Sequence, residues 1–149
     1  MIALAPDSID PAALVADFTQ SATGAGAIVS FSGIVRHDGR VRELWLDHHE
    51  RLTLAAFEAI ESEARHRFAL TDLAIVHRIG SVAAGEPIVF AAAAATHRRA
   101  AFDAVDFVMD RLKTGVPLWK RETRSDGSHW IEARPQDHSD ATRWETSVE

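Results

Sequence analysis

The alternation of apolar and polar residues predicts a β-hairpin in the first third of the chain. An apolar segment at residues 27–36 has the composition of a strand. Asp38-Gly39 follows it and is a strong signal for a two-residue turn. Residues 41–48 then alternate well enough for a returning strand, although Trp45 interrupts the pattern. We therefore expect residues 27–36 and 41–48 to pair with each other.

The clearest amphipathic helix is predicted at residues 52–68. Glutamate and arginine side chains occupy most positions between its apolar residues. The apolar stripe, at helical spacing, consists of Phe57, Ile60, Ala64 and Phe68. A stripe of this width indicates a helix that packs one face against the rest of the core.

Capping residues predict two further helices. Asp10 and Pro11 have the order of an N-cap and a first helical position, for a short helix that ends near residue 19. Thr96 is the expected N-cap of a second long helix. Gly115 would end that helix shortly after residue 113.

Four more strands are predicted in the second half of the chain. They span residues 73–79, 88–95, 118–124 and 129–133. A turn at residues 84–87 separates the first two, and Asp126-Gly127 makes the last two an additional β-hairpin. Strand pairs mixed with two long helices predict an α+β fold, in which helices cover a mainly antiparallel sheet.

Composition indicates one domain that spans residues 1–149. The chain is 46% hydrophobic and 26% charged, as in an ordinary globular protein, and no linker or repeat divides it. Residues 135–149 form a polar tail that we expect to be less ordered, with Trp144 as its anchor. No signal peptide or apolar run long enough to cross a bilayer is evident, so a cytoplasmic location and no membrane contact are expected.

The distribution of charge indicates an anion site within an acidic protein. The formal net charge of the chain is −6, which argues against a nucleic-acid partner. Between residues 97 and 124, however, seven Lys and Arg residues stand against four Asp and Glu residues. A local basic cluster of this kind favours a small anionic ligand over a polyanion surface.

The first candidates for chemistry are two lysines, Lys113 and Lys120. The sequence holds no other lysine, and its remaining basic residues are all arginine. Arginine stays protonated in proteins, whereas burial or a neighbouring cation lowers the pKa of lysine enough for proton transfer. Glycine and proline between the two lysines let the chain turn, so that both amines can face one pocket. The alternative is a pair of ordinary surface lysines.

Three further candidate features have plainer alternatives. Residues 96–99, Thr-His-Arg-Arg, stand at a predicted helix start and could bind an anion, or could simply be a solvated helix cap. Asp47-His48-His49 could contribute metal ligands, but neighbouring residues on a strand point to opposite faces, so no metal site is expected. The chain has no cysteine, which excludes disulfides, a thiolate nucleophile and cysteine-type zinc sites.

Five segments, in order along the chain, resemble the large, catalytic subunit of molybdopterin synthase. The longest runs from Lys113 through Pro117, Trp119 and Lys120 to Glu122 and is similar to the KTxxPxWK(K/R)E signature of that family. The other four are Gly33-Ile34-Val35-Arg36, His77-Arg78-Ile79-Gly80, His97-Arg98 with Ala101-Phe102, and Trp130-Ile131-Glu132-Ala133. The resemblance covers roughly residues 26–144, and five matches at compatible spacing make it specific.

The resemblance implies a specific reaction and a specific assembly. The family converts cyclic pyranopterin monophosphate into the dithiolene molybdopterin, with an α/β hammerhead fold and no cofactor of its own. Sulfur arrives as a thiocarboxylate on the C-terminal Gly-Gly of a small ubiquitin-like subunit, and two large subunits form the homodimer core of a heterotetramer. By position, Lys113 and Lys120 match the catalytic lysines, and Arg36, His97 and Arg98 match substrate-binding residues.

Two other functions remain open at this point. A non-catalytic, anion-binding scaffold subunit would have the same basic segment and bind the pyranopterin without transferring sulfur. A metal phosphoesterase would use Asp47, His48 and His49 and contain stoichiometric metal.

Overall fold

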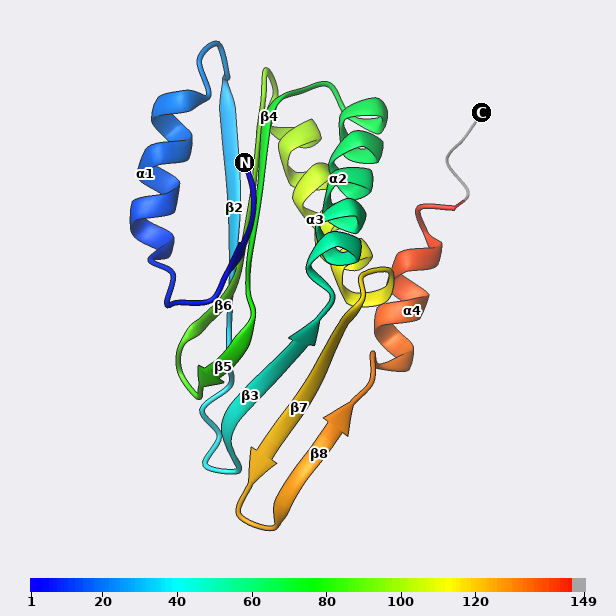
Figure 1. The fold of residues 1–149 in the computed structure, drawn as a ribbon. Helices are drawn as coiled ribbons and strands as arrows, with labels where there is room; N and C mark the ends of the chain where they lie inside the picture. Colours follow the sequence, from blue (N-terminus) through cyan, green and yellow to red (C-terminus); the bar gives the residue numbers. More distant parts are fainter. Residues whose placement is uncertain (146–149) are drawn as a thin grey trace.

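The computed structural model describes residues 1–145, which form two four-stranded sheets and four helices (Figure 1). The first sheet has the order β1 (Ile2–Ala5), β4 (Leu70–Arg78), β6 (Pro87–Ala95) and β2 (Ala27–Ile34). The second has the order β5 (Gly80–Ala83), β3 (Val41–His48), β7 (Leu118–Arg124) and β8 (Gly127–Ile131). The helices are α1 (Pro11–Ser21), α2 (Glu50–Arg67), α3 (Arg98–Thr114) and α4 (Pro135–Thr142). The predicted α+β class is confirmed.

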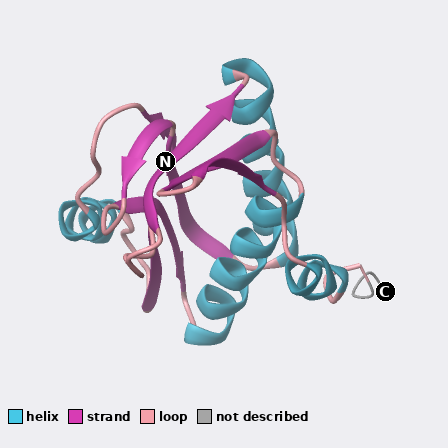
Figure 2. Ribbon diagram, turned by 90° about the horizontal axis from the view of Figure 1, so that it is seen from below, coloured by secondary structure: helices cyan, strands magenta, loops and turns pink. Residues whose placement is uncertain are grey.

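The first sheet is covered on both faces. Helix α1 packs on one face, and α2 and α3 pack on the other, so that Figure 2 shows strands running between α1 and the remaining helices. Alternate residues of the central strands therefore enter different cores: Ile75 and Ala91 lie under α2 and α3, whereas Val76 and Phe90 contact the core under α1. This double burial explains why β6 is continuously apolar instead of alternating.

The predicted pairing of residues 27–36 with 41–48 is wrong. Strand β2 pairs with β6 in the first sheet, and β3 pairs with β5 and β7 in the second. The turn itself forms, with the Asp38 carboxylate accepting hydrogen bonds from the backbone of Arg40 and Val41. A turn signal specifies only a local reversal, whereas the apolar β6, buried on both faces, needs a partner strand on each side and takes β2 as one of them.

Two short strands were not predicted. Strand β1 runs parallel to β4, with Ile2 opposite Ile75, and β5 begins at Gly80, where the sequence pattern indicated the end of a strand. Gly80 has a φ of +71°, which lets the chain leave β4 and enter the second sheet without strain. Four residues give too few alternations for a period-2 pattern to be recognised.

Helix boundaries differ slightly from those expected. The N-cap of α3 is His97, not Thr96, and its side chain makes no capping hydrogen bond. Helix α2 starts at Glu50, two residues before the expected start, because His49 accepts a hydrogen bond from the Leu52 amide and acts as the N-cap. The predicted cap Asp10 does accept from two amides at the start of α1.

The polar tail is more ordered than expected. Residues Pro135–Thr142 form α4, which packs on α3. Trp144 anchors the segment as predicted: its ring lies edge-on to Phe68 and Phe107, at 5.9 and 5.4 Å between centroids, and its indole N–H donates to Asp110. Residues 146–149 of the tail lie outside the described part of the chain. Within residues 1–145 we find no helix with the length and apolarity needed to span a membrane.

Candidate functional site

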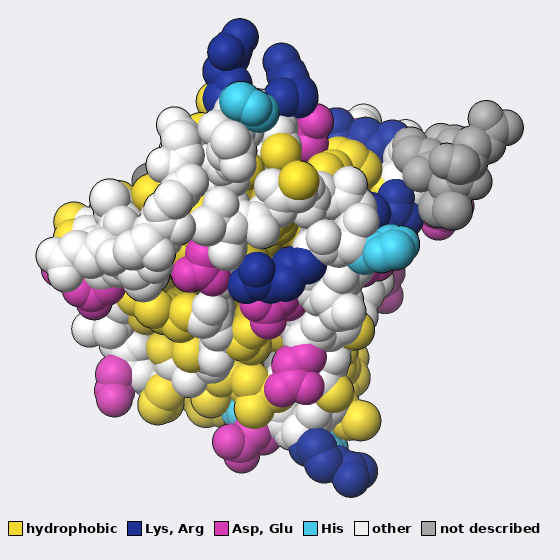
Figure 3. Space-filling view, turned by 90° about the horizontal axis from the view of Figure 1, so that it is seen from above, with side chains coloured by type: hydrophobic (Ala, Val, Ile, Leu, Met, Phe, Trp, Pro, Cys, Tyr) yellow, Lys and Arg dark blue, Asp and Glu magenta, His cyan; other side chains and the backbone are white. Residues whose placement is uncertain are grey.

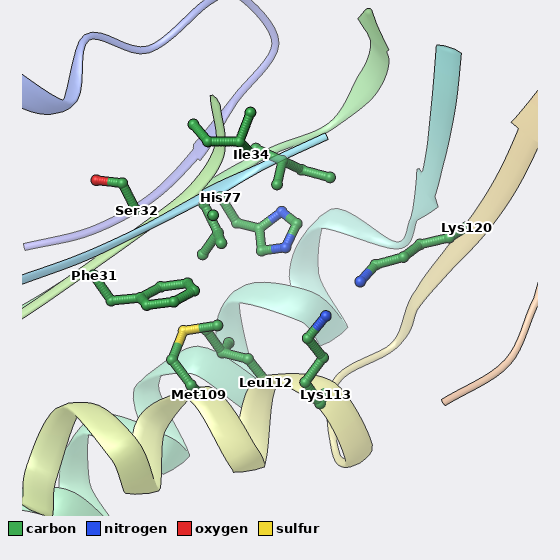
Figure 4. A pocket seen from close by; sticks show the side chains of 11 residues that line it. Phe31, Ser32, Ile34, His77, Met109, Leu112, Lys113 and Lys120 are labelled. Atoms are coloured by element: carbon green, nitrogen blue, oxygen red, sulfur yellow. The ribbon is translucent and has the colours of Figure 1, made fainter. Parts of the chain in front are cut away.

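Two adjoining cavities lie where the inner face of the second sheet meets the end of α3. The smaller has a volume of about 270 Å³ and the larger about 440 Å³. Both are lined by Ile34, His77, Ile88, Leu112, Lys113 and Lys120. Figure 4 shows the two lysine side chains converging on the smaller cavity, each from a different element.

Local structure explains how both lysines reach this point. Lys113 lies in the last turn of α3, where the negative end of the helix dipole favours a cation. Lys120 lies on β7 and pairs with the buried Leu46, so strand alternation turns its side chain inward and turns Trp119 outward. The connection between them is held by the Thr53 hydroxyl, which donates to the carbonyl of Pro117 over 3.0 Å.

The electrostatics of the lysine pair suit proton transfer. Burial and, to a smaller extent, the positive charge of Lys113 lower the pKa of Lys120 from 10.5 to about 8, although the negative charge of Asp137 opposes the shift. At neutral pH the Lys120 amine is therefore mainly protonated but close to the point at which it gives up its proton. The alternative of an ordinary surface lysine does not fit this environment of Lys120, whereas the Lys113 side chain is exposed.

His77 is a site residue that the sequence analysis quoted only as part of a motif. It is 5% exposed, lines both cavities and has its Nδ1 atom 2.7 Å from the carbonyl oxygen of Arg78. Burial lowers the pKa of His77 to about 4, and the charges of Lys120 and Lys113 act in the same direction. The imidazole is thus neutral. The only sequence signal was a histidine inside an otherwise apolar strand.

Arg36, one of the three residues expected to bind substrate, lines the larger cavity. Asp38, Glu122, Arg134 and Asp137 also line that cavity, so its wall carries both signs of charge. The Arg134 guanidinium lies 3.1 Å from an Asp137 oxygen, and its hydrogen bond lowers the pKa of that carboxyl. Arg36 is therefore a basic group available to an anion near the lysines.

His97 and Arg98 are not brought to this pocket. They stand at the start of α3, whereas Lys113 is in its last turn, and 15 residues of helix separate Arg98 from Lys113 by about 22 Å. Figure 3 looks onto the end of the molecule where α3 begins, and shows basic, acidic and hydrophobic side chains side by side. Within one chain, His97 and Arg98 therefore lie at the opposite end of α3 from Lys113.

Asp47, His48 and His49 do not form a metal centre. The Asp47 carboxylate accepts from the His48 amide, and His49 caps α2. Across residues 1–145 no group of three or more His, Asp or Glu side chains is placed to hold a metal ion.

Comparisons with known proteins agree on one family. A model of the MoaE protein family matches residues 4–115. The molybdopterin synthase catalytic subunit of Caulobacter vibrioides is 42% identical over 146 residues, which are 97% of each chain. The structure of the molybdopterin biosynthesis MoaE protein from Burkholderia ambifaria matches with a TM-score of 0.84 and 40% identity, covering 100% of this chain and 99% of that one.

One further structure shares the fold at lower identity. The complex of subunits 1 and 2 of the molybdopterin-converting factor from Helicobacter pylori contains a chain with a TM-score of 0.78 and 21% identity, with 89% of this chain and 91% of that one covered. Because the family match spans most of the chain and the Caulobacter relative covers nearly all of it, the assignment does not depend on the lysine motif alone. This chain belongs to the MoaE family, the catalytic subunits of molybdopterin synthase in molybdenum cofactor biosynthesis.

Proposed function

We propose that this chain, in the cytoplasm, transfers sulfur from the thiocarboxylated C-terminal glycine of a small ubiquitin-like subunit to cyclic pyranopterin monophosphate, giving the dithiolene of molybdopterin. The observation that carries the proposal is the convergence of Lys113 and Lys120 on one cavity, with the pKa of Lys120 lowered to about 8. The lack of cysteine supports an external sulfur donor, because this chain cannot form a persulfide. The Helicobacter pylori complex supports a small partner subunit.

The lysines serve the acyl chemistry of the donor. The thiocarboxylate sulfur bonds to a side-chain carbon of the pyranopterin, and an oxygen substituent of that carbon leaves with a proton from a lysine ammonium. Water then adds to the acyl carbon, the bond between that carbon and sulfur breaks, and the carrier leaves as a carboxylate. Lys113 and Lys120 stabilise the negative oxygen of the tetrahedral intermediate and supply the proton. The sulfur stays on the pterin, and a second thiocarboxylated carrier delivers the second sulfur of the dithiolene by the same steps.

The substrate phosphate is held by Arg36 together with His97 and Arg98 of a second copy of this chain. The length of α3 keeps His97 and Arg98 about 22 Å from Lys113 of their own chain, too far for one small substrate to contact both. Phe102, one turn after Arg98, is 53% exposed, which fits a surface covered by another subunit. The active assembly is accordingly a homodimer, with a small subunit on each copy to make a heterotetramer.

Mixing two inactive variants tests the shared site. Arg98→Ala and Lys120→Ala are each expected to be nearly inactive, but dimers with one chain of each kind contain one intact site. After unfolding and refolding together, an equimolar mixture should regain about a quarter of wild-type turnover, since half of the dimers are mixed and each has one working site. Turnover in the mixture no higher than in the separate variants would place both residues in the same chain's site.

The pH dependence of turnover is expected to report Lys120. If its ammonium form donates the proton, turnover falls as pH rises through about 8, instead of near the ordinary lysine value of 10.5. Steady-state rates between pH 6 and 9.5 would show this alkaline limb. In Lys120→Arg the guanidinium does not titrate, so the remaining activity should lack the limb. A wild-type rate that stays flat to pH 9.5 would contradict a proton-donor role.

Reconstitution tests the proposed function as a whole. Purified chain, thiocarboxylated small subunit and cyclic pyranopterin monophosphate should yield the dithiolene product, at a rate comparable to that of an established catalytic subunit. Tight binding of the pyranopterin without sulfur transfer would support the scaffold alternative instead. Turnover that depends on added metal would argue for the phosphoesterase chemistry that Asp47, His48 and His49 suggested.

A further inference from the structure

The tautomer of His77 is fixed by its backbone neighbour. A carbonyl oxygen can only accept, so the 2.7 Å contact with Arg78 requires Nδ1 to carry the proton. Nε2 is then an unprotonated acceptor with a free lone pair. The ring is 5% exposed and lies beside the buried Phe57, at 6.3 Å between ring centroids, so its orientation is set by packing. His77 therefore presents a fixed acceptor to whatever faces its Nε2 edge.

The Nε2 side of the His77 ring faces Lys113 and Lys120. Figure 4 shows the far nitrogen of the His77 ring directed toward the side chains of Lys113 and Lys120, which come from α3 and β7. All three residues line the smaller cavity. The positive charges of both lysines also act on the imidazole, lowering its pKa. The His77 ring is therefore close enough to both amines to interact with them electrostatically.

The nearby carboxylates are bonded to other groups or lie outside the smaller cavity. Glu122, on the same strand as Lys120, is bonded to the Arg124 guanidinium, and Asp137 of α4 is bonded to Arg134. Asp38 and Glu132 line the larger cavity alone, and among the described residues no carboxylate lines the smaller cavity, where His77 meets the two lysines. The neutral Nε2 is therefore the acceptor best placed for a lysine amine.

We propose that His77 is a positioning residue for the sulfur transfer: its Nε2 atom accepts a hydrogen bond from one of the two lysine amines and holds that amine in place for proton transfer. This inference rests on the proposed function of the lysine pair. A carboxylate here would form an ion pair and raise the lysine pKa, whereas a neutral acceptor orients the amine without adding charge. The neutral His77 ring can therefore orient a lysine amine and still leave that amine able to titrate near neutral pH.

Two substitutions at His77 distinguish the role of Nδ1 from the role of Nε2. In His77→Asn the side-chain amide can replace Nδ1 and donate to the Arg78 carbonyl, but nothing replaces Nε2. In His77→Gln the longer side chain can place an amide oxygen near the position of Nε2. Because Lys113 and Lys120 are the only lysines in the chain, protein labelled with ¹³C at lysine Cε gives just two signals to follow against pH. The variants Lys113→Arg and Lys120→Arg assign them.

The two variants should differ in both readouts. In His77→Asn, the lysine ammonium loses the hydrogen bond that it donates to Nε2. The pKa of that lysine should therefore be about one unit lower than in the wild type. Turnover should fall about tenfold in kcat with little change in KM, because the loss affects proton transfer and not binding. In His77→Gln, the titration should stay close to that of the wild type and most of the kcat should return.

Several results would overturn the proposal. One is a folded His77→Asn whose lysine signals titrate as in the wild type; another is an equal loss of kcat in both variants, which indicates a structural role. Long-range ¹H–¹⁵N spectra of the wild-type protein report the tautomer of His77 directly and do not depend on the folding of a variant. A proton on Nε2 instead of Nδ1 would leave no acceptor for a lysine amine and would contradict the proposal. If the wild type makes no dithiolene product, the proposed function fails, but the lysine titrations still decide the contact with His77.

Discussion

Replacing Lys120 by alanine is expected to reduce dithiolene formation by roughly 10²–10³-fold, the usual cost of removing a group that stabilises an oxyanion or transfers a proton. The side chain turns inward from β7 to the cavity, and burial with a neighbouring positive charge lowers its pKa to about 8. Lys113→Ala should cause a loss of similar order, because Lys113 faces the same cavity from α3. Single-turnover assays with thiocarboxylated small subunit would measure the effect on chemistry directly.

The matched control is Arg121→Ala. Arg121 is the next residue on β7, turns to the opposite face and stacks its guanidinium over Trp130 at 5.6 Å. Its replacement removes a cation of the same segment without touching the cavity, so turnover should stay within about twofold of the wild type. Thermal unfolding of Lys120→Ala should remain close to that of the wild type, since removing a partly buried lysine relieves a desolvation cost. Normal turnover in both lysine variants would exclude these residues from the reaction.

The sequence predicted local features of the site better than its global arrangement. Lys113 and Lys120 were recognisable because proton transfer needs lysine and the chain uses arginine everywhere else. Glycine and proline between them indicated the turn that brings both to one cavity. His77 could not be singled out, because its role depends on the backbone carbonyl of Arg78 and on side chains far away in sequence.

The partition of the strands into two sheets was not predictable from local patterns. Asp38-Gly39 gives the same turn whether the strands around it pair or separate. Separation follows from the hydrogen bonds between Val35 and residues 85 and 86, which keep the end of β2 beside β6 before the chain crosses to β3. The cavities are lined from both sheets and from α3, so the error in pairing concealed the pocket, although both lysines were noted as candidates.

Replacing Phe57 by alanine should cost about 3–5 kcal/mol of unfolding free energy, among the largest effects expected for a single core position. Phe57 is fully buried in the core shared by α2, α3 and the first sheet, and its ring lies beside that of His77. Alanine is the best helix former, so the loss would reflect the cavity and not a weakened α2. Urea denaturation followed by circular dichroism would give the difference.

Leu52→Ala on the same helix is the control for Phe57→Ala. Leu52 is 50% exposed, so its truncation should change the unfolding free energy by less than about 1 kcal/mol. Phe57→Ala should also lower kcat beyond the fraction of protein that is unfolded, because the cavity frees the His77 ring to turn its Nε2 edge away from the lysines. A variant that loses stability but keeps full kcat in its folded fraction would show that packing against Phe57 is not what orients His77.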